Sequence, residues 1–280
     1  MPQFALFPNL QKQGSLEHAK EIRNHLLSRG SAVVVEDSIA EELKAPPLSS
    51  VHPSELDFLV AIGGDGTIMR LVHRHPEIEA PIIGVNLGHL GFMADIPLEE
   101  VYTSLDKILA NRYTIERRLM MEGRSESGLS CIAVNEIVFH RARNPTLVGL
   151  AIYVDGVYLN TFEADGVILA TPSGSTAYSL AAGGPIVAPK LDAFVLTPIS
   201  PHTISNRPIV LMPDVEVSVQ YISHYDPVEI AYDGIARFSM KTGEIFRVRR
   251  AARSFLLVTL TDHDYFLTLR CKLGWVGSLR

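Results

Sequence analysis

The pattern of apolar residues changes once along the chain, and this change is the strongest constraint on the fold. Up to about Tyr113, continuous apolar runs alternate with segments in which apolar residues recur at helical spacing. Such alternation predicts a parallel sheet covered by helices on both faces. We expect strands at 4–7, 32–35, 58–62 and 82–85, and helices at 16–27, 68–73 and 98–109, the first helix capped by Ser15.

Beyond Tyr113 most segments have strand patterns and helical patterns are scarce. Asp155-Gly156 and Asp233-Gly234 each separate two strand-like runs, which predicts two-residue hairpins. The sequence thus predicts an N-terminal α/β domain with a parallel, Rossmann-like sheet (1–112) and a mostly antiparallel all-β domain (113–260). The tail (261–280) has helical composition in part, and we expect it to pack back on the first domain.

Composition excludes several classes of protein. Hydrophobic residues make up 47% of the chain, which favours a packed core over disorder, and the net charge of -6 argues against broad nucleic-acid binding. No apolar run is long enough to cross a membrane, and the first residues do not resemble a signal peptide. Cys131 and Cys271 form no CxxC pattern. We therefore expect a cytoplasmic protein with neither nucleic-acid nor membrane partners.

A glycine loop, residues 63–67 (GGDGT), follows one buried strand and opens a helix. Its glycines allow close approach of a ligand, and N–H groups at a helix start favour phosphate. Asp65 is unusual there, because a carboxylate repels phosphate unless a metal or a proton transfer accounts for it. The alternative is a tight turn in which Asp65 is a cap. Arg70, one helical turn further on, is either a phosphate contact or a surface arginine.

Two shorter polar stretches accompany this loop. Residues 86–91 follow the next strand and are expected at the same edge of the sheet, where ligands bind in open α/β folds. Its histidine, His89, is more consistent with a structural role than with catalysis. Asn135-Glu136 interrupts an apolar strand over 132–139, where neighbouring side chains point to opposite faces. The pair indicates a ligand contact or a buried polar network, with a solvent-facing strand edge as the alternative.

The longest motif runs from Asp165 to Ser179 and is rich in small hydroxyl residues. A strand leads into a Ser/Thr/Gly loop, a short helix and then Gly183-Gly184-Pro185. Hydroxyl groups can bond sugar oxygens or adenine nitrogens, and loop N–H groups can bind phosphate. The alternative is an ordinary loop with a Ser or Thr cap. The segment lacks the GxSxG pattern of a serine-hydrolase elbow.

In this order the motifs resemble those of the NAD kinase family of bacterial type, over nearly the whole chain. The glycine loop alone is also similar to that of lipid kinases and phosphofructokinases. The run 171–178 that follows Asp165-Gly166 is far more specific to NAD kinases. The segments that carry the resemblance are 63–67, 86–91, 135–136, 165–185, 201–208 and 272–275.

The resemblance implies transfer of a terminal phosphoryl group from ATP or polyphosphate to the 2′-hydroxyl of the adenosine ribose of NAD. It also implies a divalent metal, expected to be Mg²⁺, and a homodimer or homotetramer with NAD between the domains. By position, Asp65 matches the general base and Gly66 its neighbour in the binding loop, and we add Arg70 as a phosphate contact. The matching dinucleotide-binding positions are Asn135, Glu136, Asp165, Thr176, Ala177, Tyr178, Ser179, Leu180 and Ala181.

Two other functions compete with this one. A lipid or sugar kinase would share the glycine loop but would leave the run that follows Asp165 unexplained. A non-catalytic dinucleotide sensor would keep the hydroxyl-rich pocket and lack the base. The presence of Asp65 favours the enzyme.

Overall fold

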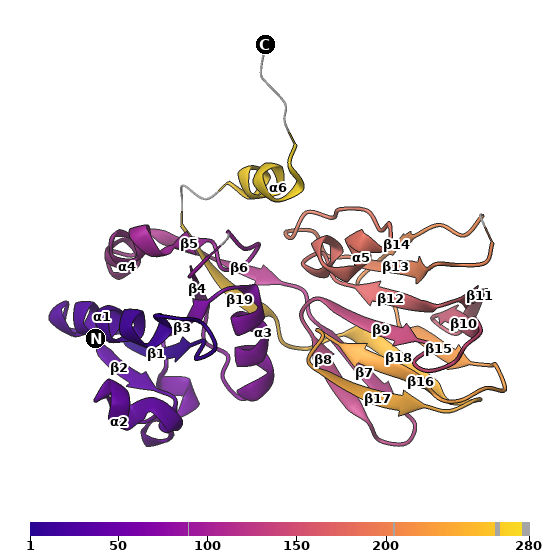
Figure 1. The fold of residues 1–280 in the computed structure, drawn as a ribbon, viewed down its shortest axis with the longest axis horizontal. Helices are drawn as coiled ribbons and strands as arrows, with labels where there is room; N and C mark the ends of the chain where they lie inside the picture. The colour runs from indigo at the N-terminus through magenta and orange to yellow at the C-terminus, as the bar shows by residue number, and fades with distance from the viewer. Residues whose placement is uncertain (89, 204, 261–263, 276–280) are drawn as a thin grey trace, which may run out of the picture. The chain divides into compact units, whose positions relative to one another are not determined.

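The computed structural model describes residues 1–88, 90–203, 205–260 and 264–275, which divide into two compact units. The first combines Met1–Glu116 with the segment from Leu256 onward, and the second is Arg117–Phe255. In Figure 1 the yellow strand β19 (Phe255–Leu260) lies among the indigo and magenta strands of the first unit. The chain therefore leaves the first unit once and returns to it.

The first unit is built on a seven-stranded sheet in the order β2-β1-β3-β4-β19-β6, with β5 beside β4. Strand β1 pairs in parallel with β2 and β3, and β4 pairs in parallel with β3, β5 and β19. The remaining bounds are β1 (Gln3–Pro8), β2 (Ala32–Val35), β3 (Phe58–Gly63), β4 (Ile82–Asn86), β5 (Ile96–Pro97) and β6 (Tyr113–Arg118).

Helices cover both faces of this sheet, as the continuous apolar strands predict. Ile83 and Val85 of β4 lie in one apolar cluster with α1 (Ser15–Ser28) and α4 (Val101–Leu109). Gly84 points to the other face, where a Cβ would stand 3.0 Å from Ile68 of α3 (Asp65–Arg74). The shorter helices are α2 (Ala40–Leu43), α5 (Tyr178–Ala181) and α6 (Tyr265–Leu273).

Two helix starts differ from the predictions. Gly14, with φ 76°, is the N-cap of α1, and the side chain of Ser15 makes no capping bond. The Ser15 hydroxyl is buried and lacks a hydrogen-bond partner among the described residues. The helix expected from residue 98 begins at Val101, because Leu98–Glu100 forms a 3₁₀ turn. No helix in the described part of the chain is long and apolar enough to span a membrane.

The second unit contains two six-stranded antiparallel sheets. The first has the order β11-β10-β15-β18-β7-β8 and the second β14-β13-β12-β9-β16-β17. The first sheet comprises β7 (Met121–Ser125), β8 (Ser130–Ala133), β10 (Val148–Val154), β11 (Val157–Ala164), β15 (Val217–Tyr221) and β18 (Ile245–Arg250). The second comprises β9 (Glu136–His140), β12 (Gly166–Ala170), β13 (Phe194–Ile199), β14 (Ile209–Leu211), β16 (Val228–Tyr232) and β17 (Ala236–Met240).

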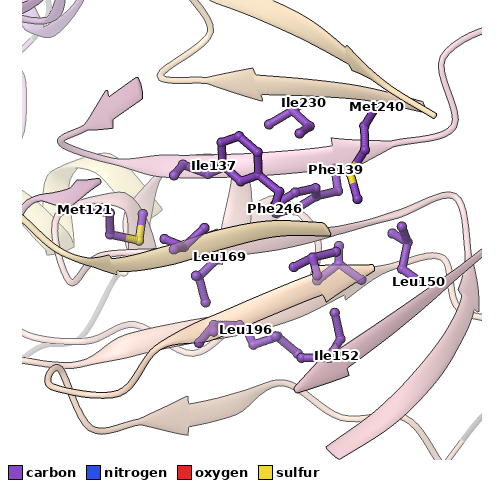
Figure 2. Close-up of a cluster of buried hydrophobic side chains, with 14 of the residues drawn as sticks. Met121, Ile137, Phe139, Leu150, Ile152, Leu169, Leu196, Ile230, Met240 and Phe246 are labelled. Carbon is purple, nitrogen blue, oxygen red and sulfur yellow. The ribbon is translucent and has the colours of Figure 1, made fainter. Parts of the chain in front are cut away.

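Alternate side chains of these two sheets form one apolar core (Figure 2). Phe139 of β9 and Phe246 of β18 meet edge to face, with ring centroids 5.8 Å apart. Both predicted hairpins are present, and their Asp-Gly residues all have positive φ, as a type I′ turn requires: Asp155 (49°), Gly156 (77°), Asp233 (47°) and Gly234 (65°). The second hairpin differs from the prediction in one respect, because Tyr232 pairs with Ala236 and the connection therefore has three residues, 233–235. The unit is thus a β-sandwich, in agreement with the predicted all-β domain.

Candidate active site

The glycine loop joins the carboxyl end of β3 to α3 within very little space. A Cβ on Gly63 would stand 2.8 Å from the Cβ of Asn9 and would overlap the Thr67 hydroxyl, so only glycine fits. Asp65 is the first residue of α3, and its side chain does not cap that helix. Gly66 follows within the first turn, where a Cβ would make an ordinary contact with Arg70 at 3.8 Å.

The Asp65 carboxylate binds the backbone that follows the neighbouring strand β4. Its Oδ1 accepts N–H groups from Met93 (3.0 Å) and Ala94 (2.8 Å), and its Oδ2 accepts one from Phe92 (2.9 Å). Because a carboxylate has about four lone-pair sites, acceptor capacity remains on Oδ2. The carboxylate is therefore held in one orientation and can still accept a further proton donor.

Two cationic side chains lie beside this loop. The Lys12 ammonium donates to the Gly63 carbonyl, and Arg70 Nη2 lies 3.4 Å from the Thr67 hydroxyl. Arg70 also lines a cavity of about 230 Å³ together with residues of the loop after β1. Lys12 is not among the predicted site residues, although a lysine in the loop after the first parallel strand is a usable signal. His89 lies outside the described residues.

In the second unit, Asp233 organises a break between two strands. Its carboxylate accepts N–H groups from Val134 (2.8 Å), Asn135 (2.8 Å) and Glu136 (3.1 Å). The predicted single strand over 132–139 is therefore wrong: β8 ends at Ala133 in one sheet and β9 begins at Glu136 in the other. These three N–H groups bond a side chain in place of a neighbouring strand. Asp233 was predicted only as a turn residue.

Buried oxygen atoms without protein partners gather at this break. Among the described residues, Asn135 Oδ1, Glu136 Oε2 and Ser173 Oγ are all buried and accept or donate no hydrogen bond. Glu136 is only 7% exposed. Burial, and then the charge of Asp233, raise the pKa of Glu136 to about 8, whereas the Tyr178 N–H bonded to it acts in the opposite direction. Glu136 is therefore mostly protonated at neutral pH and can donate a hydrogen bond.

The hydroxyl-rich loop packs directly on Asn135. The Thr171 N–H donates to the Asn135 carbonyl (2.8 Å), and a Cβ on Gly174 would stand 2.8 Å from Asn135 Cα. Several hydroxyls that we expected to face a ligand are used inside the protein: Thr171 bonds Val134 O (2.6 Å), Ser175 bonds Pro172 O (2.7 Å), Thr176 bonds Ser173 O (3.2 Å) and Ser179 bonds Thr197 Oγ1 (2.9 Å). These four bonds hold the loop in shape and use part of the bonding capacity of each hydroxyl, so the contacts of Thr176 and Ser179 with a ligand stay a prediction.

The other predicted site residues of the second unit lie at two separate positions, around α5 and at the far end of β12. Ala177 precedes α5, whose residues Tyr178 and Ala181 are exposed, whereas Leu180 is partly buried. Asp165 lies at the opposite end of β12 from Thr171, about 20 Å away along an extended strand. There it forms an ion pair with Arg141 at 2.7 Å. The second unit thus brings Asn135, Glu136 and the 171–178 loop together, but not Asp165.

The described side chains form no resident metal centre. Among the described residues, no three or more His, Cys, Asp or Glu side chains lie together in a way that could hold an ion. Asp65 already accepts three N–H bonds, so of its about four lone-pair sites only one, on Oδ2, remains for a further partner. Mg²⁺ in kinase sites is commonly bound by one or two carboxylates together with the substrate phosphates. A divalent ion here would therefore depend on the phosphates of a substrate.

An α/β unit with a glycine loop, followed by a β-sandwich with a buried polar cluster, is consistent with a two-domain kinase, and family models identify which kind. Residues 4–113 match the ATP-NAD kinase N-terminal domain, and residues 134–260 match the ATP-NAD kinase C-terminal domain. The chain is 57% identical to the NAD kinase of Protochlamydia amoebophila over 276 residues, covering 99% of each protein. The chain belongs to the NAD kinase family, enzymes that phosphorylate NAD.

Other relatives agree with this assignment. The chain is 38% identical to the NAD kinase of Moorella thermoacetica, covering 99% of this chain and 91% of that protein. Yeast NADH kinase complexed with NADH superposes with a TM-score of 0.88 at 29% identity, covering 100% and 89% of the two chains. The Archaeoglobus fulgidus NAD kinase in complex with ATP gives a TM-score of 0.77 at 26% identity, covering 99% and 100%.

Proposed function

We propose that this chain transfers the terminal phosphoryl group of ATP to the 2′-hydroxyl of the adenosine ribose of NAD, giving NADP. The observation that carries the proposal is the orientation of Asp65. Its carboxylate belongs to the glycine loop at the start of α3, and three backbone N–H groups fix it. Membership of the NAD kinase family supplies the acceptor and the donor.

In this proposal Asp65 is the general base. A ribose hydroxyl is a weak nucleophile, and it needs its proton accepted while the new phosphorus–oxygen bond forms. A positioned base contributes about 10²–10⁴-fold to such reactions. Positioning and charge neutralisation contribute more, because phosphoryl transfer passes through a loose transition state. The unused acceptor capacity of Asp65 Oδ2 suits this role.

The dinucleotide binds, in this proposal, at the polar cluster of the second unit. Asn135 Oδ1 accepts a ribose hydroxyl, and the protonated carboxyl of Glu136 donates to a ligand oxygen. Burial of both atoms without partners among the described residues supports this, since an unsatisfied buried polar group costs about 1–3 kcal/mol. The 176–181 segment would contact the ligand mainly through its backbone, with Asp165 as a more distant contact. The α/β domain (1–112) supplies the donor site and the β domain (113–260) the NAD site.

The donor, metal and assembly complete the proposal. ATP or polyphosphate brings Mg²⁺ with its phosphates, and the ion offsets their negative charge. We place the enzyme in the cytoplasm as a homodimer or homotetramer. The free thiols of Cys131 and Cys271 suit a reducing compartment.

A coupled assay tests the proposal. The purified chain is mixed with NAD, Mg²⁺ and either ATP or polyphosphate, and NADP is detected with an NADP-specific dehydrogenase. We expect NADP with at least one donor. A folded protein that binds NAD but forms no NADP with either donor would overturn the proposal in favour of a dinucleotide sensor. Phosphorylation of a lipid or sugar in place of NAD would favour the other alternative.

A further inference from the structure

We propose that Lys12 binds the phosphates of the donor in the crevice between the loops that follow β1 and β3. This inference rests on the proposed function and adds to it a phosphate-binding residue outside the glycine loop. The glycine loop itself contains no lysine that could bind phosphate: residues 63–67 (GGDGT) are followed by Ile68.

The strand order indicates where a ligand enters. The chain passes from β1 to β2 on one side, and then crosses to β3 on the other side of β1. The order β2-β1-β3-β4 therefore reverses direction between β1 and β3. In open α/β sheets, ligands bind outside the carboxyl ends of the strands at such a point. Lys12 follows β1, and the glycine loop follows β3, so the two segments flank this crevice.

Local backbone contacts direct Lys12 toward the crevice. Its N–H donates to the Asn9 carbonyl (2.9 Å), and its own carbonyl accepts the N–H of Ser15 (3.2 Å), which fixes the turn before α1. The ammonium then donates to the Gly63 carbonyl. A Cβ on Gly64 would stand 3.5 Å from the ammonium nitrogen, and one on Gly88 would stand 3.7 Å from it. One cation therefore lies beside the loops that follow β1, β3 and β4.

The ammonium retains capacity for an anion. A lysine has three N–H donors, of which one is used on Gly63 O. Within the described ranges it forms no ion pair with a carboxylate, whereas Arg74 of the same unit is paired with Glu36 at 2.6 Å. A compact ammonium binds phosphate as a point charge. Lys12 would thus offset the repulsion between the donor phosphates and the fixed carboxylate of Asp65.

A purely structural role for Lys12, as a clamp on Gly63, makes a different prediction. Loss of a clamp would loosen the loop and weaken every ligand together with the stability of the protein. Loss of a phosphate contact at the donor site would weaken the ligands of that site in proportion to their phosphate charge, and it would leave intact the binding of NAD, which the proposed function places in the second unit. The comparison therefore needs one ligand made only of phosphate and one that has none.

The test compares Lys12→Met with wild type and with Lys20→Met, which removes a lysine charge from α1 instead. We expect kcat/KM for ATP to fall about 10²–10³-fold in Lys12→Met. The inhibition constant of tripolyphosphate should rise about tenfold or more. The inhibition constant of adenosine, the Kd of NAD and the Tm should stay at their wild-type values, and Lys20→Met should match wild type throughout.

Two results would overturn the assignment: kcat/KM for ATP unchanged in Lys12→Met, or adenosine and NAD weakened as much as tripolyphosphate along with a lower Tm. If wild type itself forms no NADP, the proposed function fails. Tripolyphosphate binding to wild type and Lys12→Met, measured directly by calorimetry, then still decides whether Lys12 binds phosphate.

Discussion

A Cβ on Gly91 would stand 2.8 Å from the carboxyl carbon of Asp65, so the absence of a side chain at Gly91 leaves the space that this carboxylate occupies. The N–H groups of the next three residues then hold the carboxylate. Two loops that follow neighbouring parallel strands are thereby joined at one charged group. The position of Asp65 therefore depends on Gly91 as well as on the glycine loop.

Gly91→Ala is therefore expected to displace the Asp65 carboxylate. Misplacing a reacting group by about 1 Å can cost 10²-fold in rate, and we expect kcat to fall by about that factor. Steady-state NADP formation measures the change. Gly30→Ala is the control, because its added Cβ meets no atom within 4 Å and only its positive φ (81°) is strained. Gly30→Ala should lower the Tm and keep kcat; an unchanged kcat in Gly91→Ala would contradict the proposed geometry.

The raised pKa of Glu136 predicts a stability that falls with rising pH. The folded protein holds a proton up to about pH 8, whereas the unfolded chain releases it near 4.5. Between these values, this group lowers the free energy of unfolding by up to about 1.4 kcal/mol per pH unit. The stabilisation is complete below the lower value and lost above the higher one. Glu136→Gln does not titrate, so its urea unfolding curves should depend less on pH between 5 and 8. If the free energy of unfolding depended on pH equally in both proteins, the raised pKa of Glu136 would be refuted.

Asp233→Asn is expected to destabilise the second unit and weaken NAD binding. An amide can keep the bonds to Asn135 and Glu136 but presents its own N–H groups to Val134, which leaves a donor unpaired at a cost of about 1–3 kcal/mol. Asp155→Asn is a matched control in the other Asp-Gly turn, where the side chain accepts one N–H, from Glu216 at 2.8 Å. Calorimetric titration with NAD should give a higher Kd for Asp233→Asn than for Asp155→Asn. Equal NAD affinity in both would show that the break at Asn135 does not shape the binding site.

The fold could be predicted from the sequence because its signals are local. The apolar strands, the helical spacing and the two Asp-Gly turns each depend on a few neighbouring residues. The break at 134–135 depends instead on Asp233, almost a hundred positions away, so the apolar run alone predicts one strand. Gly14 replaced Ser15 as the cap because a glycine tolerates the positive φ at that position.

The candidate site was predictable in part for the same reason. Residue types and spacing single out Asp65, Asn135 and Glu136. The residue types and spacing do not indicate that most hydroxyl groups of the 171–178 loop donate to nearby carbonyl groups, since that depends on how the loop folds. Nor do they single out Lys12, whose position beside Gly63 follows from the adjacency of β1 and β3.

In the proposed reaction Asp65 accepts the proton of the ribose hydroxyl, and single-turnover NADP formation by wild type and Asp65→Asn tests this role. The asparagine Oδ1 can keep the N–H bonds of Met93 and Ala94, while its NH₂ group loses the bond from Phe92 at a cost of about 1–3 kcal/mol. The two remaining bonds should hold the loop in place. We expect a rate of NADP formation about 10²–10⁴-fold below wild type, with NAD binding retained. A wild-type rate in Asp65→Asn, or the loss of NAD binding together with the rate, would contradict it.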